Sequence, residues 1–393
     1  MKILSIETSC DETAAAVVED GVKIICNIIA SSTKMHEKYG GIVPEVAARE
    51  QLKCIIPVIT ESLQPFFQTN STLLHRSVEL QSLRMKETII KSIDAIAVTV
   101  GPGLIGSLLV GVETAKTIAF VTGKPIIPVN HVIAHMYANL VDSSFVIPGL
   151  TRNPSSFSTG SRLGGRDDNR KIQFPAISLV VSGGHTELYL MKSSKDLTWL
   201  GGTLDDAAGE CFDKTARLLG FGHGGGASIQ SAAEKFKVSS LKFKISLPRP
   251  MMHDTTLNFS FSGLKTAVMR EWKKCHPGLD PGSSLKIDSG STAGMTNAFA
   301  YKIQEAITDV LVKKTLRAAN QFGAKSILLS GGVAANTRLR EKFSILNSQF
   351  SIHAPDAALC TDNAVMIGAA ALFNGTPTDW HSITAQPDLS VEI

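Results

Sequence analysis

The feature that most constrains the fold is a pattern of strand, tight turn and returning strand that occurs twice. The first copy spans residues 3–18 with a polar turn at 8–13, and the second spans residues 177–191 with the turn Ser-Gly-Gly-His-Thr at 182–186. Helical patterns follow each copy, as is typical of α/β domains. The repeat therefore predicts two related α/β lobes with a cleft between them. One large α/β domain with unrelated hairpins is the alternative.

The individual elements are predicted from apolar periodicity and from turn signals. A third strand follows the first pair across the turn Asp20-Gly21, and Pro44 suits the first turn of a helix. The expected strands are residues 3–6, 14–18, 22–30, 95–100, 126–129, 177–181, 187–191 and 326–329, and the expected helices are residues 44–63, 106–121, 130–140, 204–219, 298–319 and 363–373.

Composition bounds the class of protein. The 393 residues, 44% of them hydrophobic, are enough for two domains with separate cores. A formal net charge of +4 permits a nucleic-acid partner without requiring one. The six cysteines are scattered without a Cys-x-x-Cys pair, as in proteins of a reducing compartment. We find no signal peptide and no run of about 18 uncharged apolar residues, and we expect a cytoplasmic protein without a membrane span.

Three segments lack the pattern of the rest. Residues 64–86 are polar without a clear period, and residues 143–170 and 275–296 are rich in Pro, Gly and Ser. The last two share a Pro-Gly-Leu tripeptide that is followed shortly by Ser-Ser. Such compositions bury too little apolar surface to offset the entropy of the chain. We expect all three segments to be surface insertions outside the core.

Two glycine pairs directly follow apolar strands. The first is Gly183 and Gly184, and the second, Gly331 and Gly332, also precedes an expected helix. Glycine lets backbone N–H groups approach an anion closely, and the start of a helix favours a phosphate. Together with the polar turn at 8–13, the two pairs favour a nucleotide cleft over ordinary hairpin turns. No P-loop or G-x-G-x-x-G motif is present, which disfavours the P-loop and Rossmann folds.

His131 and His135 are the candidate metal ligands. Their i, i+4 spacing in an expected helix places both imidazoles on one face. Taken alone, two such histidines are about as often core or surface residues as ligands. A third ligand is needed, and Asp362 is the candidate, with capping of the last helix as its alternative role. The zincin pattern, with Glu directly after the first His, is absent, which disfavours a metallopeptidase.

Asp11 and Glu12 are adjacent carboxylates in the first polar turn. Such a pair suits a general base, a partner of a metal-bound water or a ligand near a phosphate, and a solvated turn is the alternative. Further along, residues 260–265 resemble a substrate-facing loop. A basic cluster that suits either RNA phosphates or a solvated face comprises Lys242, Lys244, Arg249, Lys265, Arg270, Lys273 and Lys274.

Taken together, these motifs resemble one family. The resemblance begins with Ile-Glu-Thr-Ser-Cys-Asp-Glu-Thr at residues 6–13 and continues in order over nearly the whole chain, apart from the three insertions. The family is that of the tRNA N6-adenosine threonylcarbamoyltransferases of the TsaD type, once labelled sialoglycoprotein endopeptidases. The other segments that carry the resemblance are residues 39–45, 101–108, 180–186, 205–210, 212–216, 248–251, 258–265, 330–336 and 360–363.

The resemblance implies a fold. It is the two-lobed, actin-like ATPase-domain fold of the α/β class, built from duplicated ribonuclease-H-like lobes with an interlobe cleft. We expect the N-terminal lobe to comprise residues 1–128 with about 366–393, and the C-terminal lobe to comprise residues 129–365.

The resemblance also implies the site residues. By position, His131, His135 and Asp362 match the family's ligands for one divalent metal ion, for which we expect iron(II) in preference to zinc. Asp11 and Glu12 are the catalytic candidates, since either carboxylate can accept the proton of an amine. The positions that match the family's substrate contacts are Val180, Val181, Ser182, Gly183, Gly184, Asp213, Gly226 and Asn336.

The implied activity is transfer of a threonylcarbamoyl group from threonylcarbamoyl-AMP to N6 of the adenosine 3′ of the anticodon, in tRNAs that read codons starting with adenine. The implied partners are tRNA, a paralogous actin-like subunit and a small ATPase. The alternatives are an ATP-hydrolysing or sugar-phosphorylating member of the fold, a metallopeptidase and a non-catalytic scaffold subunit. A kinase cleft does not need the histidine pair with Asp362, and a scaffold subunit is expected to lose it.

The insertions are expected to be dispensable for folding. Limited proteolysis should cut first within residues 143–170 or 275–296, because segments without buried apolar side chains are the most accessible to proteases. Mass spectrometry of the fragments locates the cuts. A deletion of residues 275–296 that abolished folding would contradict this expectation.

Overall fold

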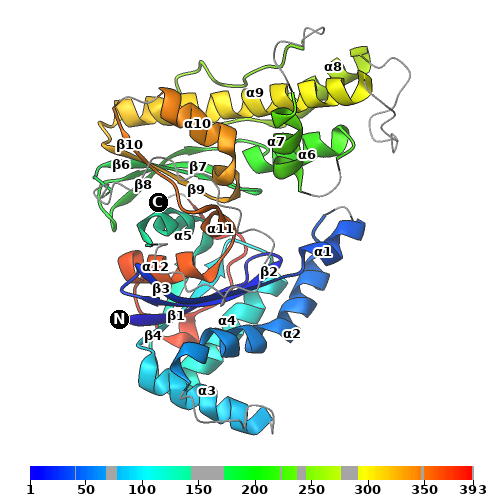
Figure 1. Cartoon of the computed structure of the whole chain (residues 1–393). Coiled ribbons are helices and arrows are strands. Elements are labelled where there is room, and N and C mark those ends of the chain that lie inside the picture. The colour runs from blue at the N-terminus through cyan, green and yellow to red at the C-terminus, as the bar shows by residue number, and fades with distance from the viewer. Residues whose placement is uncertain are drawn as a thin grey trace. The chain divides into compact units, whose positions relative to one another are not determined.

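A computed structural model describes residues 1–39, 41–67, 78–142, 172–221, 224–236, 245–275, 291–346 and 349–391. The chain divides into two compact units, one formed by Met1–Ser161 with Pro355–Ile393 and the other by Arg162–Ala354. Each unit is built around one five-stranded sheet (Figure 1).

The sheet of the first unit combines a hairpin meander with two parallel strands. The meander consists of three consecutive antiparallel strands, β1 (Lys2–Glu7), β2 (Glu12–Glu19) and β3 (Lys23–Ser31). Strands β4 (Ala95–Gly101) and β5 (Ile126–Asn130) continue the sheet from the other edge of β1, parallel to it. Most residues of β1, β2 and β4 are buried, as expected for strands covered on both faces. The predicted meander is confirmed.

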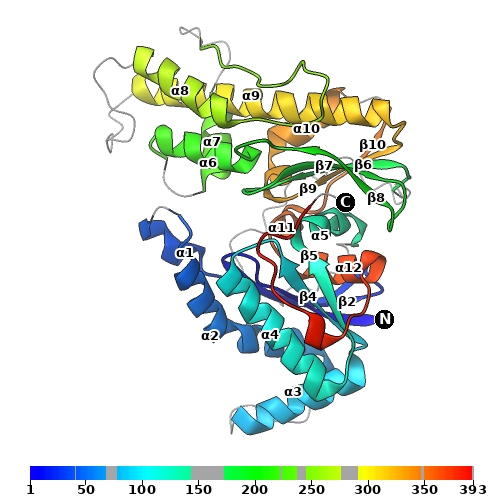
Figure 2. The ribbon, with the colours of Figure 1, turned by 180° about the vertical axis from the view of Figure 1, so that it is seen from behind.

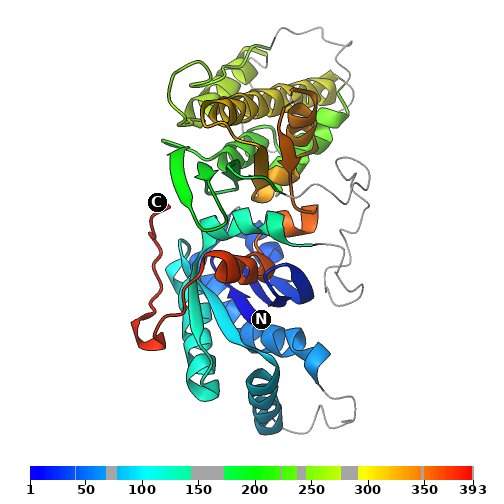
Figure 3. The same cartoon turned by 90° about the vertical axis from the view of Figure 1, so that its left-hand side faces the viewer.

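Helices cover both faces of this sheet. The helices α2 (Pro44–Ser62), α3 (Val78–Ser92) and α4 (Ile105–Thr122) supply one core together with alternate residues of β1 and β2. The opposite face is covered by α12 (Ala364–Asn374), which packs on α5 (His131–Tyr137) (Figure 3). The shorter helical turns of the unit are α1 (Thr33–His36), α11 (Ala357–Cys360) and the 3₁₀ turns Glu37–Tyr39, Gln64–Phe66, Ala138–Leu140 and Trp380–Ser382.

Within the described residues, α4 is the one helix that is long and apolar enough to cross a membrane by length and composition. Its buried side chains, which include Val110, Val112 and Ala115, pack in the core between α2 and β4. α4 is therefore a core helix of the first unit.

The sheet of the second unit repeats the plan of the first. The antiparallel meander consists of β6 (Ala176–Val181), β7 (Thr186–Met191) and β8 (Leu197–Gly202). Strands β9 (Ser326–Ser330) and β10 (Ser351–His353) then extend the sheet parallel to β6. The strand orders β3-β2-β1-β4-β5 and β8-β7-β6-β9-β10 are the same topology, so the predicted duplication is confirmed.

The long helix α9 (Ser291–Gln321) organises the helices of the second unit. It contacts β6 and β9 of the sheet and also α6 (Ala208–Leu218), α7 (Gly225–Glu234) and α10 (Thr337–Leu346). Helix α8 (Ser262–Cys275) packs on α6. The views from the front and from behind show α9 running the length of this helical layer (Figures 1 and 2). A 3₁₀ turn at Gly332–Ala335 follows β9.

The structure departs from the sequence-based expectations in several elements. The sequence does not predict strands β8 and β10 or helices α7, α8 and α10. The prediction of an irregular segment at residues 64–86 is wrong from 78 onward, because α3 begins there, and residues 291–296 likewise belong to α9. Helix α3 keeps Leu80 and Leu83 exposed, which obscures its periodicity in the sequence. Residues 143–170 lie outside the described part of the chain.

The contact division also differs from the expected lobe boundaries. Helix α5 follows β5 and packs on α12, so residues 131–140 share contacts with the first unit. Residues 355–365 lead into α12 and join the same unit. As a result, the three candidate metal ligands all belong to the first unit.

Candidate metal centre and glycine-lined pocket

The two histidines are positioned by the start of α5. Asn130 ends β5 and caps the helix, because its Oδ1 accepts hydrogen bonds from the backbone N–H groups of Val132 (2.9 Å) and Ile133 (3.2 Å). His131 and His135 are the first and fifth residues of the helix and lie on one face, with ring centroids 4.8 Å apart. The predicted shared face is confirmed.

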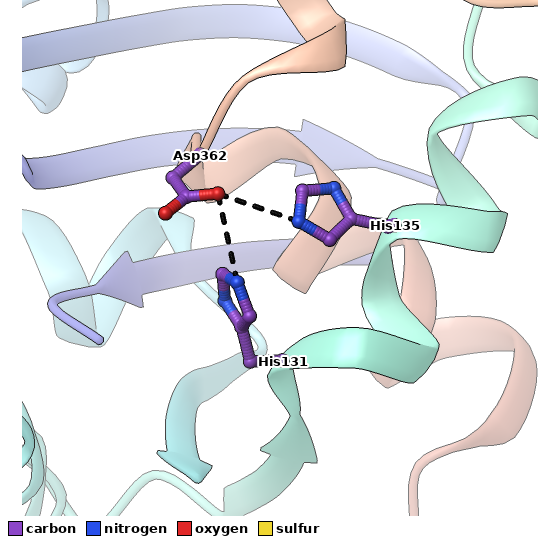
Figure 4. A group of neighbouring side chains, drawn as sticks. All are labelled: His131, His135 and Asp362. Carbon is purple, nitrogen blue, oxygen red and sulfur yellow. Dashed lines mark ion pairs between the residues drawn. The ribbon is translucent and has the colours of Figure 1, made fainter. Parts of the chain in front are cut away.

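Asp362 completes the group from a distant part of the chain. Its Oδ1 lies 3.5 Å from Nε2 of His131 and 3.3 Å from Nε2 of His135 (Figure 4). The alternative role of Asp362 as a helix cap is not observed, because the capping oxygen is Oδ1 of Asn363, which accepts from the N–H of Met366 at 3.1 Å. The carboxylate of Asp362 instead faces the two imidazoles.

This group fits a divalent metal ion. The candidate ligand atoms lie within 4.8 Å of one another. His135 is 2% exposed, and within the described part of the chain neither of its ring nitrogens makes a hydrogen bond, although Nε2 faces Asp362. A buried imidazole without a partner is costly unless a metal ion or another group satisfies it. Two imidazoles and one carboxylate form a donor set that binds a metal and leaves further coordination positions open.

Glu7 orients His131 from the other side of its ring. Nδ1 of His131 lies 3.2 Å from Oε2 of Glu7 and 3.2 Å from Oγ of Ser9. The Glu7 carboxylate is buried and also accepts from the N–H of Ser9 (2.6 Å) and from the hydroxyl of Thr99. An ionised carboxylate only accepts, so the hydrogen of His131 belongs on Nδ1. In the neutral imidazole that binds a metal, Nε2 would then present its lone pair on the side of Asp362, as in metal sites with a carboxylate behind the histidine.

The carboxylates of Glu7 and Asp362 shift the pKa of His131, and His131 in turn shifts the pKa of Glu7. Burial acts to lower the pKa of His131, but Glu7 and Asp362 outweigh it and raise that pKa to about 9. Burial acts to raise the pKa of Glu7, and the adjacent His131 outweighs it, so that this pKa lies below its ordinary value. The site is therefore built to hold positive charge.

Asp11 directly precedes β2 and Glu12 is its first residue, and hydroxyl groups anchor both carboxylates. Thr33 donates to Oδ2 of Asp11 at 2.7 Å, and Ser31 donates to Oε1 of Glu12 at 3.2 Å. Burial, followed by the charges of Asp11 and Asp362, raises the pKa of Glu12 to about 9. Glu12 therefore carries a proton at neutral pH. The alternative of a freely solvated turn does not describe Asp11, which is 8% exposed.

Gln51 holds this turn and was not identified from the sequence. It is 1% exposed, and its Nε2 lies 2.9 Å from the carbonyl oxygen of Glu12, 3.0 Å from that of Cys10 and 3.4 Å from that of Thr8. The available signal was a polar residue in the buried stripe of α2, which otherwise contains Ala47, Ile55 and Ile59. A polar residue at such a position needs a partner, and here the turn provides it.

The glycine turns of the second unit lie at the ends of neighbouring strands. Val180 of β6 pairs with Ser330 of β9 in parallel register, so the turns that follow both strands are adjacent. Gly331 has φ +85°, and a Cβ atom there would overlap the carbonyl oxygen of Val181. Only glycine suits this position.

A pocket of about 440 Å³ adjoins these turns. Four of the eight predicted substrate contacts line it, namely Gly183, Asp213, Gly226 and Asn336. The other four end β6 or belong to its turn: Val180 and Val181 have buried side chains, and Ser182 and Gly184 are not part of the lining. The remaining lining residues are Gly209, Phe212, Gly224, Gly225, Ala227, Gln230, Ser231, Glu234, Gly332, Val333 and Ala335.

The walls of the pocket combine glycine backbone with a few polar groups. Asn336 is 8% exposed; it donates to Gln304 at 3.0 Å and accepts from the N–H of Leu339 at 3.0 Å. A Cβ atom at Gly225 would overlap the carboxylate of Asp213, so the backbone passes directly beside that side chain. Carboxylates suit ribose hydroxyls, and glycine N–H groups suit phosphate oxygens. The pocket thus has the chemistry of a nucleotide site.

The segment at 260–265 is fixed by one carboxylate. Asp205 accepts from the N–H groups of Phe261 (2.8 Å) and Ser262 (3.2 Å), and from the hydroxyls of Ser260 and Ser262 at 2.6 Å each. Burial acts to raise the pKa of Asp205, but these hydrogen bonds hold it below its ordinary value. Asp205 thereby joins the motif at residues 205–210 to residues 260–262 at the start of α8.

The basic cluster is partly used in internal ion pairs. Arg249 lies 2.8 Å from Asp309, and Lys274 lies 2.6 Å from Glu271. These pairs reduce the positive charge available to a phosphate backbone. Lys242 and Lys244 lie outside the described residues.

Solved structures show the same fold at low sequence identity. T. kodakarensis HypF matches 94% of this chain and 47% of its own length, with a TM-score of 0.53 and 13% identity. A full-length HypF in its phosphate- and nucleotide-bound form matches 94% of this chain and 55% of its own length, with a TM-score of 0.50 and 12% identity. These likenesses show the fold alone, and the expected actin-like fold class is confirmed.

Sequence relatives are far closer. Proteins named tRNA N6-adenosine threonylcarbamoyltransferase are 43% identical in Thermomicrobium roseum (95% of this chain, 92% of the relative), 42% identical in Persephonella marina (93% and 88%) and 39% identical in Moorella thermoacetica (98% and 96%). The family model TsaD, tRNA N6-adenosine threonylcarbamoyltransferase, matches residues 23–70, 79–151 and 162–369. The chain therefore belongs to the TsaD family, and its activity is that of a tRNA N6-adenosine threonylcarbamoyltransferase.

Proposed function

We propose that the transfer from threonylcarbamoyl-AMP is metal-assisted, with His131, His135 and Asp362 as the ligands and the glycine-lined pocket as the adenylate site. The observation that carries this proposal is the buried histidine pair facing Asp362, in which His135 makes no hydrogen bond to the described residues. An ATP-hydrolysing or sugar-phosphorylating enzyme of the same fold has no need of such a group. The glycine turns and the few polar groups of the pocket walls support the placement of the adenylate.

The reaction needs an activated donor and an oriented acceptor. The exocyclic amine of adenine is a poor nucleophile because its lone pair is delocalised into the ring. The acceptor is the N6 amine of the adenosine 3′ of the anticodon, in tRNAs that read codons starting with adenine. That amine attacks the carbamoyl carbon of the mixed anhydride, the C–O bond to the phosphate breaks, and AMP leaves. Holding the reactants in place supplies much of the rate enhancement.

Iron(II) is the metal that we propose, because two imidazoles and one carboxylate with open positions are a donor set that suits it. When bound, the metal would supply Lewis acidity toward the threonylcarbamoyl group. Glu7 keeps His131 in the tautomer that presents Nε2, and it offsets positive charge at the centre. These residues therefore set the geometry and the charge of the site.

Asp11 is assigned as the general base that accepts the proton of the attacking amine. Glu12 holds a proton at neutral pH, since burial and the nearby carboxylates raise its pKa to about 9. A protonated carboxyl donates and does not accept, so Asp11 is the better base of the two. Thr33 donates to Oδ2 of Asp11 and helps to hold this carboxylate in place.

A paralogous actin-like subunit is proposed to dock on the exposed apolar face of α2 and α4, with a small ATPase completing a cytoplasmic complex. Leu52 and Ile56 of α2 are 65% and 48% exposed, and Ile105 and Leu109 of α4 are 50% and 44% exposed. The two helices meet where a Cβ atom at Gly106 would lie 3.2 Å from Ala48. Apolar side chains gathered on neighbouring helices are typical of a protein–protein interface.

Replacing His131 by Ala should remove the metal and the activity but not the fold. Two remaining ligands bind weakly, so we expect metal affinity and transfer to fall at least about 100-fold. Elemental analysis and nucleoside analysis of the modified tRNA measure the two effects. His36→Ala, at a buried histidine of the same unit outside the metal group, is the matched control and should retain the metal. Full occupancy in the His131→Ala protein would refute the ligand assignment.

Substituting Gly183 or Gly332 by Val should weaken nucleotide binding in a folded protein. A Cβ atom at either position meets nothing within 4 Å, so the extra carbons project into the pocket without displacing protein atoms. We expect AMP affinity, measured by calorimetry, to fall roughly tenfold or more, which corresponds to about 1.4 kcal/mol. Gly263→Val, which is equally uncrowded but outside the pocket, should bind AMP normally. Unchanged affinity in the two pocket variants would refute the placement.

Gln51→Met should reduce transfer more than it reduces AMP binding. Methionine has a similar length but cannot donate to the carbonyl groups of the 8–12 turn, and each orphaned group costs about 1–3 kcal/mol. The carboxylates of Asp11 and Glu12 then lose their fixed position, so kcat should fall. Thr60→Val on the same helix, which removes bonds to Ile56 and Met85 but none to the 8–12 turn, serves as the control. A Gln51→Met enzyme with normal kcat would show that the turn does not depend on this side chain.

Leu52→Glu should prevent association with the paralogous subunit. A charge in the centre of an apolar interface is desolvated without a partner, so affinity should fall at least about 100-fold. The residue is 65% exposed, and the folded monomer should therefore be unchanged. Size-exclusion chromatography of the mixed subunits measures association, and circular dichroism measures folding. Normal association of the variant would place the partner elsewhere.

A further inference from the structure

The chain that follows α12 contacts the first residue of β5 and then the last residues of β4. The N–H of Thr378 donates to the carbonyl oxygen of Ile126 at 2.9 Å, and the N–H of Gln386 donates to that of Val100 at 2.7 Å. Figure 2 shows this segment, in red, running from the turn Trp380–Ser382 toward α5. The segment therefore reaches the edge of the sheet from which the metal ligands project.

Residues 386–390, here called the strap, contact the loop that follows β4. The carbonyl oxygen of Pro387 accepts from the N–H of Gly103 at 3.1 Å. A Cβ atom at Gly101 would overlap the carbonyl oxygen of Gln386, so the two backbones touch directly. Glycine is required here by the close approach.

That loop in turn holds Ser9. The N–H of Leu104 donates to the carbonyl oxygen of Ser9 at 2.8 Å, and a Cβ atom at Gly103 would lie only 2.5 Å from the same oxygen. The hydroxyl of Ser9 lies 3.2 Å from Nδ1 of His131. The strap thus reaches one side of the His131 ring through a continuous series of contacts.

A second route reaches His131 through the backbone. Nδ2 of Asn130 donates to the carbonyl oxygen of Ser390 at 3.2 Å, while Oδ1 of the same side chain caps α5. Leu389 packs against the core of the first unit and anchors the strap. Asn130 directly precedes His131, so one amide side chain links the strap to the start of the metal-binding helix.

The start of α5 needs external support. The helix has seven residues, and helices of this length are marginal without tertiary contacts. Its first residue is itself a ligand, and a terminal residue has fewer helical hydrogen bonds to fix it. Small shifts of a ligand weaken a metal site, because coordination tolerates only a few tenths of an ångström.

We propose that the strap positions His131 for metal binding, through Asn130 on the backbone side and through the 101–104 loop and Ser9 on the ring side. Asn130 and Leu389 are its positioning residues. The inference rests on the proposed metal site of His131, His135 and Asp362. It assigns to residues 386–390 a role in metal affinity, in addition to any contribution to stability.

The test compares metal affinity with stability in four full-length variants. Leu389→Ala removes the anchor of the strap. Asn130→Ser keeps a capping oxygen but lacks the donor to Ser390, so helix capping is retained. Trp380→Ala is the matched control, because Trp380 belongs to the same segment and packs on the core and on Phe120, with ring centroids 5.4 Å apart. His131→Ala tests the site itself.

Zinc binding to each metal-free protein is measured by competition with a chelating dye, at a temperature where thermal unfolding shows every variant to be folded. We expect Leu389→Ala and Asn130→Ser to bind zinc about 10- to 100-fold more weakly than the unchanged protein, the range for residues that orient ligands. Trp380→Ala should bind normally even where its Tm falls as far as that of Leu389→Ala.

Two results would overturn the proposal. The first is that Leu389→Ala and Asn130→Ser bind zinc with unchanged affinity. The second is that Trp380→Ala loses zinc affinity in proportion to the fall in its Tm, which would show that the strap acts only through stability. Normal zinc binding by His131→Ala would instead refute the metal site on which the inference rests. An error in the proposed role of the strap and an error in the proposed metal site therefore give different results.

Discussion

The site depends on the buried hydrogen bond between Glu7 and His131. A carboxylate at the end of β1 would cost several kcal/mol to bury alone, and here it faces an imidazole, a hydroxyl and a backbone N–H. The same contact fixes the hydrogen of His131 on Nδ1 and turns Nε2 toward Asp362. Because Glu7 belongs to the central strand of the first sheet, its contact with His131 ties the candidate metal ligands to the packed core.

The duplicated topology serves two different chemistries. In the first unit, the turn after the leading strand carries Ser9, Asp11 and Glu12, and the edge of the sheet carries the histidine helix. In the second unit, the corresponding turn carries Gly183, and the next parallel strand ends in Gly331. Polar side chains at one turn and bare backbone at the other support the proposed cation site and the proposed nucleotide pocket on the same scaffold. The family membership of the chain fits this division between donor binding and acyl transfer.

Much of this arrangement was predictable from local patterns, and the rest depended on tertiary contacts. The meanders, the helix with His131 and His135, and the glycine turns follow from periodicity and spacing. The role of Glu7 does not, because its partner His131 is distant in the sequence. Gln51 was missed for the same reason, and Asn363 rather than Asp362 proved to be the helix cap. The expected lobe boundary precedes α5, because the sequence gives no sign that this helix packs on α12.

The central claim is that a metal held by His131, His135 and Asp362 assists threonylcarbamoyl transfer. The most direct measurement incubates the enzyme and its partner subunits with threonylcarbamoyl-AMP and unmodified tRNA, and quantifies threonylcarbamoyladenosine by mass spectrometry of nucleosides. The enzyme is assayed as purified, after chelation, and after iron(II) is restored. The account predicts product formation that is lost on chelation and recovered with iron(II). Product formed at an undiminished rate by the fully chelated enzyme would contradict it.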